Sequence, residues 1–176
     1  MDVQFSPQSP MMADYLRHLF PPDADGNLQV KSTNDVGRLI ISFCRTSLLP
    51  VRSDDPASLT LTLPRNAITQ GLVNKFLYIP THDQARINLA AQAVFNIDFA
   101  HFMQRGESAG FKKAELIEAF IASRGLVTTD NFETLHKKEF RLMQRQKKML
   151  FRKLYRKSFY IEECIDFSVN PQNPKP

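Results

Sequence analysis

The sequence predicts an α+β fold, with one mainly helical domain, a small sheet and a long basic helix near the C-terminus. Apolar residues recur at helical spacing over most of the chain after Thr81, whereas three shorter segments have the alternation or the apolar runs of strands. Of the 176 residues, 43% are hydrophobic and 23% are charged, as in a folded globular domain. This length suffices for one domain with its own core and is too short for two of usual size.

Both ends of the chain are expected to be flexible tails. Residues 1–10 and 170–176 are rich in Pro, Gln, Asn and Ser, a composition that buries little apolar surface. The folded domain is therefore expected to span residues 11–169. The start of the chain lacks the basic residues and the apolar run of a signal peptide, and no window approaches the ~18 apolar residues of a membrane span. We therefore expect a cytoplasmic protein that does not enter a membrane.

Two short helices are expected before residue 50. Residues 11–20 carry apolar side chains at helical spacing and are followed by Pro21, which ends a helix. Residues 34–47 fit an amphipathic helix with Thr33 or Asn34 as its N-cap. The same segment is rich in β-branched residues, so a buried strand stays open as the alternative.

Three segments are predicted to form the small sheet. Ser58–Leu63 alternates strictly, with its leucines facing inward. Lys75–Ile79 is an apolar run that ends at Pro80, and Phe159–Val169 alternates again. We expect these strands to pack together against the helices.

The chain from Thr81 onward is predicted to be helical. Thr81 and Gln84 have the spacing of a capping box at the start of one helix, and a short helix is expected around Phe99–Gln104. Lys112–Arg124 has the pattern of an amphipathic helix, with Gly125 as its C-terminal stop.

The last predicted helix, over residues 131–157 after an Asp130 cap, carries most of the positive charge. Between Lys137 and Lys157 the chain holds ten Lys or Arg and one acid, Glu139. This segment has a formal charge of +9, which leaves −4 for the remainder of a chain with a net charge of +5. The molecule is therefore expected to be a mildly acidic body with one strongly basic helix.

The cations of this helix are predicted to lie on one side. At about 100° per residue, seven of them fall within an arc about 100° wide, while Leu and Met occupy the opposite side. The seven are Lys137, Lys138, Arg141, Arg145, Lys148, Arg152 and Arg156. Such a row repels itself by a few tenths of a kcal/mol per i,i+4 pair, a cost that a polyanion relieves. Glu139 is expected to project near the apolar side instead.

These patterns predict a small non-enzymatic or regulatory protein that binds nucleic acid, DNA before RNA, through phosphate contacts and with weak sequence specificity. One alternative is an assembly protein whose basic helix docks on an acidic protein partner or pairs with a second copy as a homodimer. Another is a solvated face that only maintains solubility. A membrane-surface helix is disfavoured, because the Leu and Met side chains are expected to pack on the Lys112–Arg124 helix.

Motifs for catalysis, cofactor binding or metal binding are missing from the sequence. The four histidines are far apart, and the six glycines form no phosphate-binding loop. Cys44 and Cys164 are 120 positions apart, and their surroundings favour two buried thiols in a reducing compartment over a disulfide. We therefore expect no cofactor, no metal ion and no enzymatic activity.

Overall fold

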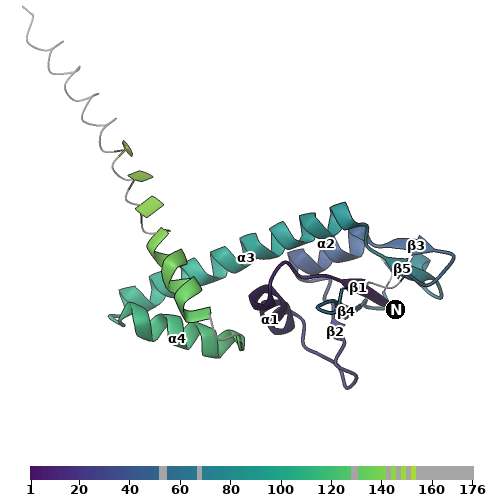
Figure 1. The fold of residues 1–176 in the computed structure, drawn as a ribbon, viewed down its shortest axis with the longest axis horizontal. Helices are drawn as coiled ribbons and strands as arrows, with labels where there is room; N and C mark the ends of the chain where they lie inside the picture. Colours follow the sequence, from purple (N-terminus) through teal and green to yellow (C-terminus); the bar gives the residue numbers. More distant parts are fainter. Residues whose placement is uncertain are drawn as a thin grey trace, which may run out of the picture. The chain divides into compact units, whose positions relative to one another are not determined.

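The computed structural model describes residues 1–51, 55–66, 69–127, 131–141, 144–145, 148–149 and 152–153. Helices make up 57% of the described residues, and the strands form two small sheets. This composition confirms the predicted α+β class with a majority of helix. The chain divides into two units, Met1–Glu133 and Thr134–Pro176. All the labelled elements of Figure 1 belong to the first unit.

The larger sheet has three strands in the order β1-β4-β2. The central strand is β4 (Leu59–Thr62), which pairs with β1 (Asp2–Phe5) in antiparallel fashion and with β2 (Leu28–Gln29) in parallel fashion. The strand predicted at this place is confirmed. Its leucines at 59 and 61, and Leu63 just after it, are buried, as the alternation indicated.

The N-terminal residues do not form the predicted tail. Val3 and Phe5 on β1 are 2% and 0% exposed, and Leu63 N donates a hydrogen bond of 2.9 Å to Met1 O. The expectation that residues 1–10 are flexible, with the domain starting at residue 11, is therefore wrong. A strand of four residues is too short to show its alternation, and its pairing partner lies far along the chain.

The smaller sheet pairs β3 (Arg45–Ser47) with β5 (Phe76–Tyr78) in antiparallel register. The predicted strand over Lys75–Ile79 thus exists, but it does not share a sheet with β4. The third predicted strand, Phe159–Val169, lies outside the described residues, as does the predicted tail over 170–176.

Both predicted short helices form, but the second is shorter than predicted, because residues 45–47 of the predicted segment 34–47 belong to β3. In α1 (Pro10–Leu19), the Ser9 hydroxyl oxygen accepts a hydrogen bond from Met12 N. In α2 (Asp35–Phe43), Asn34 Oδ1 accepts from Val36 N at 2.8 Å. These caps satisfy backbone N–H groups that a helix leaves unpaired at its start, and they decide the ambiguous segment in favour of a helix.

The longest element, α3 (Thr81–Ser108), is one helix where the sequence predicted two. The predicted capping box does not form, because Pro80 occupies the N-cap position and no side chain caps the helix there. Gln84 instead binds the neighbouring backbone: its Oε1 accepts from Ser6 N at 3.1 Å, and its Nε2 donates to Ile79 O at 3.0 Å. This side chain therefore holds the start of the chain against α3.

Figure 1 shows α3 along the first unit, with α2 beside its N-terminal part and α4 (Lys113–Arg124) beside its C-terminal part. Gly125 ends α4 in the left-handed conformation, with φ of +62°, as predicted. The rings of Phe95, Phe99 and Phe120 are buried where the two helices meet, and Phe120 lies edge-on to the other two. Apolar and aromatic contacts therefore hold the helices together.

All described residues between 131 and 153 are helical, in agreement with the predicted basic helix. Its predicted cap, Asp130, and its predicted end lie outside the described residues. Among the described helices, none has the length and apolar composition needed to cross a membrane. Cys44 has a free, buried thiol, and Cys164 lies outside the described residues.

Candidate nucleic-acid interface

The described helical residues after position 130 have one buried side over residues 131–139. Asn131, Leu135 and Glu139 follow at intervals of four residues and are 4%, 0% and 9% exposed. This spacing returns to nearly the same side of a helix, so residues 131–139 have a buried and an exposed face. The position of Glu139 on the buried side agrees with the sequence prediction.

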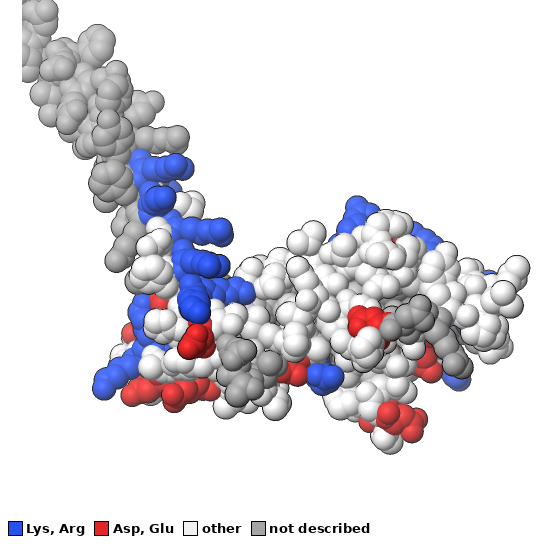
Figure 2. Space-filling model, viewed as in Figure 1, with Lys and Arg blue, Asp and Glu red and all other residues white. Residues whose placement is uncertain are grey.

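Most of the predicted cations are exposed in the part of the chain that the structure describes. Five of them have exposed side chains and are called the basic row below: Lys137, Arg141, Arg145, Lys148 and Arg152. Figure 2 shows Lys and Arg side chains gathered along this helix. Arg156, the last member of the predicted set, lies outside the described residues.

Lys138 differs from the other predicted cations. Its side chain is half-buried, and burial lowers the pKa of its ammonium group from 10.5 to about 8. Burial penalises the charged form of a lysine, because the ammonium loses part of its hydration. Lys138 therefore lies at the border of the two faces and is left out of the basic row.

Most cations of the basic row have no acidic partner among the residues that the structure describes. Arg141, Arg145, Lys148 and Arg152 form no hydrogen bond or ion pair with any residue that the structure describes. The first unit behaves differently, because four of its arginines each pair with an aspartate. These pairs are Arg17–Asp14, Arg38–Asp35, Arg86–Asp83 and Arg124–Asp98. These four cations of the basic row are thus positive charge that the described part of the fold leaves available to an external anion.

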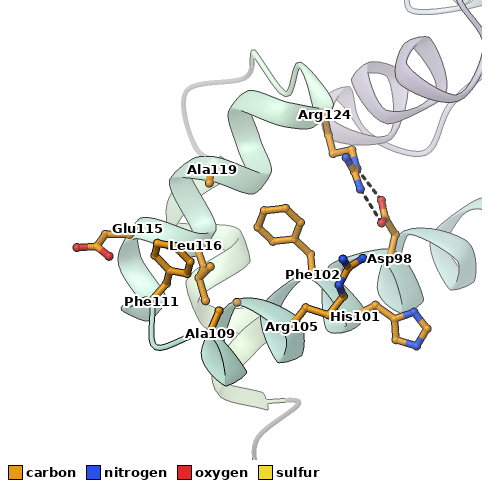
Figure 3. Close-up of a pocket in the computed structure, with 11 residues that line it drawn as sticks. Asp98, His101, Phe102, Arg105, Ala109, Phe111, Glu115, Leu116, Ala119 and Arg124 are labelled. Atoms are coloured by element: carbon orange, nitrogen blue, oxygen red, sulfur yellow. Dashed lines mark hydrogen bonds and ion pairs between the residues drawn. The ribbon is translucent and has the colours of Figure 1, made fainter.

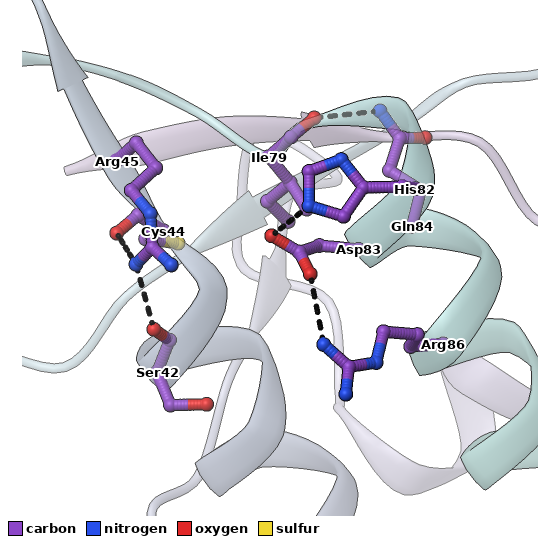
Figure 4. A network of polar contacts seen from close by, with 8 residues as sticks. All are labelled: Ser42, Cys44, Arg45, Ile79, His82, Asp83, Gln84 and Arg86. Atoms are coloured by element: carbon purple, nitrogen blue, oxygen red, sulfur yellow. Dashed lines mark hydrogen bonds and ion pairs between the residues drawn. The ribbon is translucent and has the colours of Figure 1, made fainter.

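A second polar cluster lies at the start of α3 (Figure 4). The Asp83 side chain is 3% exposed and lies 3.2 Å from His82 Nε2 and 3.6 Å from Arg86 Nη1. A carboxylate in the first turn of a helix is stabilised by the unpaired N–H groups there. The contacts of Asp83 therefore stabilise the start of α3.

Burial raises the pKa of the nearby Cys44 thiol to about 12, so this thiol stays protonated and is a poor nucleophile.

Residues suited to a metal ion do not come together in the described part of the chain, where no group of three or more His, Cys, Asp or Glu side chains is arranged to hold one. A cleft between α3 and α4 was not predicted from the sequence. Comparison with known proteins adds no assignment: no family model, curated protein or solved structure matches this chain.

Proposed function

We propose that this chain is a small non-enzymatic protein that binds nucleic acid by placing the basic row along a phosphate backbone. The observation that carries the proposal is the set of exposed cations on one helix face, four of which have no partner among the described residues. Duplex DNA is the preferred ligand over single strands, because its two backbones together offer a denser array of regularly spaced phosphates. We also propose that the protein acts in the cytoplasm, where its buried Cys44 thiol stays reduced.

The spacing of the basic row suits a phosphate backbone. From Lys137 to Arg152 the helix rises about 22 Å at 1.5 Å per residue, and successive cations are about 5–6 Å apart. Phosphates of one DNA strand follow each other at about 3.4 Å along the axis, so several cations contact phosphates at once and release counterions. Contacts of this kind position a protein on DNA without reading bases, which supports weak sequence specificity.

Charge reversal on the basic row tests the proposal. The variant R141E/R145E/K148E/R152E is compared with K31E/R65E/K75E/K112E, which makes the same change in net charge at exposed sites of the first unit. Fluorescence anisotropy with labelled duplex DNA, single-stranded DNA and RNA measures binding. We expect the first variant to lose binding and the second to retain most of it. Equal binding by both variants contradicts the proposal, since only the total charge would then matter.

The same measurements separate nucleic acid from the alternative partners. An acidic protein partner predicts negligible affinity for all three nucleic acids at physiological salt. A homodimer predicts a mass that rises with protein concentration in light scattering, and the apolar side of the helix as its interface, since two cationic rows repel each other.

A further inference from the structure

A cleft of about 890 Å³ lies between the C-terminal part of α3 and α4 (Figure 3). Its walls are formed mainly by apolar and small side chains from both helices and from the loop that joins them. The main contributors are Phe102, Gly106, Ala109, Phe111, Leu116 and Ala119. This volume lies within the range of pockets that enclose one small organic ligand.

The local sequence explains why the cleft forms. At Gly106 the two helices approach so closely that a Cβ atom would overlap the Leu116 side chain. Beside this contact, Ala109 and Ala119 are too small to fill the space between the helices. The Phe111 side chain is 60% exposed at the end of the cleft, so apolar surface is left uncovered there. A ligand that covers this surface gains hydrophobic free energy.

One cation lines the cleft without a partner. The Arg105 side chain forms no hydrogen bond or ion pair with any described residue. Arg124, by contrast, donates two hydrogen bonds of 2.8 Å to the Asp98 carboxylate, which neutralises both groups. Glu115 Oε2 accepts a hydrogen bond from Lys112 N at 3.2 Å, and Figure 3 shows its carboxylate pointing away from the seam between the helices. Arg105 is therefore the group that favours a negative charge in the cleft.

We propose that this cleft binds a small amphipathic anion, with an apolar body over Phe102, Phe111 and Leu116 and one acid group paired with Arg105. An arginine–carboxylate pair beside an apolar wall is stronger than one in open water, because water screens the two charges less there. The guanidinium also donates directed hydrogen bonds to both carboxylate oxygens. The proposal does not depend on nucleic-acid binding, since none of the lining residues belongs to the basic row.

A single tryptophan provides a local reporter, because the chain contains no Trp. Phe111→Trp places the reporter at the cleft, and Phe76→Trp, at a 49% exposed position on β5, is the matched control. Each protein is titrated with sodium decanoate, with 4-phenylbutanoate and with decyltrimethylammonium, below the micelle concentration of each. We expect the two carboxylates to change the tryptophan emission of the cleft variant saturably, and to leave the emission of the control variant unchanged.

Two further variants in the Phe111→Trp background test the geometry. Arg105→Gln is expected to raise the Kd for both carboxylates about tenfold or more, the range expected for the loss of a charged hydrogen bond. Ala119→Phe fills the cleft and is expected to abolish binding, whereas Ala122→Phe, at an exposed position of α4 outside the cleft, is expected to preserve it. Circular dichroism confirms that each variant keeps its helices.

Each other outcome overturns the proposal. An absent response of the Phe111→Trp protein, or one equal to that of the Phe76→Trp protein, means that the cleft has no specific ligand of this class. Binding of decyltrimethylammonium as tight as that of decanoate, or no effect of Arg105→Gln, removes the assigned role of the cation. Emission of the Phe111→Trp protein that changes with protein concentration alone means that a second copy occupies the cleft.

Discussion

Asp98 is the residue whose polar contacts connect α1, α3 and α4. Its carboxylate accepts two hydrogen bonds of 2.8 Å from Arg124 and one of 3.3 Å from Tyr15 Oη. The hydrogen bonds from Arg124, more than any other cause, lower the pKa of Asp98 below its ordinary value, while burial and the nearby carboxylate raise the pKa of Tyr15. Because the bonded groups come from three helices, this carboxylate fixes how the helices are arranged in the first unit.

We expect Asp98→Asn to lower the free energy of unfolding by about 1–3 kcal/mol at pH 7, since Arg124 then loses its anionic partner. Asp35→Asn is the control, because the Asp35–Arg38 pair is exposed and worth at most about 1 kcal/mol. Urea unfolding followed by circular dichroism measures both changes. Equal effects of the two substitutions contradict the role assigned to Asp98.

The contribution of Asp98 is also expected to depend on pH. Its pKa in the folded protein lies below the ordinary value of 3.8. A carboxyl group with a lowered folded pKa stabilises the protein above the unfolded pKa, and this stabilisation is lost as the pH falls through the folded pKa. The difference in stability between the parent and Asp98→Asn is therefore expected to be constant near neutral pH and to shrink below about pH 4. A difference that persists undiminished into acid contradicts this assignment.

Gly106 is expected to be intolerant of a side chain. Gly106→Ala forces a Cβ atom against Leu116, which is 5% exposed, and overpacking of this kind costs about 1–3 kcal/mol. Gly71→Ala is the matched control, because nothing lies within 4 Å of the Cβ position there. Thermal unfolding is expected to show a lower Tm for the first variant only. If both variants unfold like the parent, α3 and α4 do not approach at Gly106.

At the scale of elements, local patterns predicted the helices α1, α2 and α4 and the strand β4, and they failed where distant residues decide the structure. The division of α3 into two helices was wrong because its buried face follows Ile87, Ala91 and Phe95 and includes polar Asp83 and Asn88. Asn88 is buried because its amide exchanges hydrogen bonds of 3.0 Å with the backbone of Ser6 and Gln8. Because these partners lie about eighty residues away in the chain, they produce no periodic pattern in the sequence near Asn88.

The N-terminal strand β1 is expected to be essential to the first unit. Phe5→Ala removes a fully buried ring and is expected to cost about 3–5 kcal/mol of folding free energy. Phe111→Ala is the matched control, because its side chain is 60% exposed and contributes little to the core. Denaturant unfolding measures both. A flexible N-terminus predicts that Phe5→Ala is as harmless as the control.

The two candidate sites differ in how far the sequence predicted them. The basic row follows from the spacing of its cations along a single helix, so a projection of the sequence was enough to predict it. The cleft needs side chains from α3 and α4 together, and its one suggestive pattern, small residues at Gly106, Ala109 and Ala119, is common in packed helices. Whether the space beside such a small residue stays empty depends on how the two helices cross.

At the scale of the whole molecule, charge is divided unequally. The segment from Lys137 to Lys157 has a formal charge of +9, whereas the whole chain has a net charge of +5. The rest of the chain therefore has a net charge of −4. Within the first unit, arginines at 17, 38, 86 and 124 are paired with aspartates, whereas four cations of the basic row lack a partner among the described residues. The net negative charge of the rest of the chain repels DNA at distances up to about one Debye length. Binding is therefore expected to be confined to the basic helix and to depend steeply on salt concentration.

If the protein binds DNA as proposed, the salt dependence of binding is expected to count the phosphates that the basic row contacts. If its five cations each neutralise one phosphate of duplex DNA, the slope of log K against log salt concentration is expected to be about −4.5. Arg145→Gln is then expected to reduce the magnitude of this slope by about 0.9, because one fewer counterion is released. Lys31→Gln makes the same change in net charge at an exposed site of the first unit and is expected to leave the slope unaltered. Anisotropy titrations across a salt series measure all three slopes, and a parallel change in both variants means that DNA responds to net charge rather than to this helix.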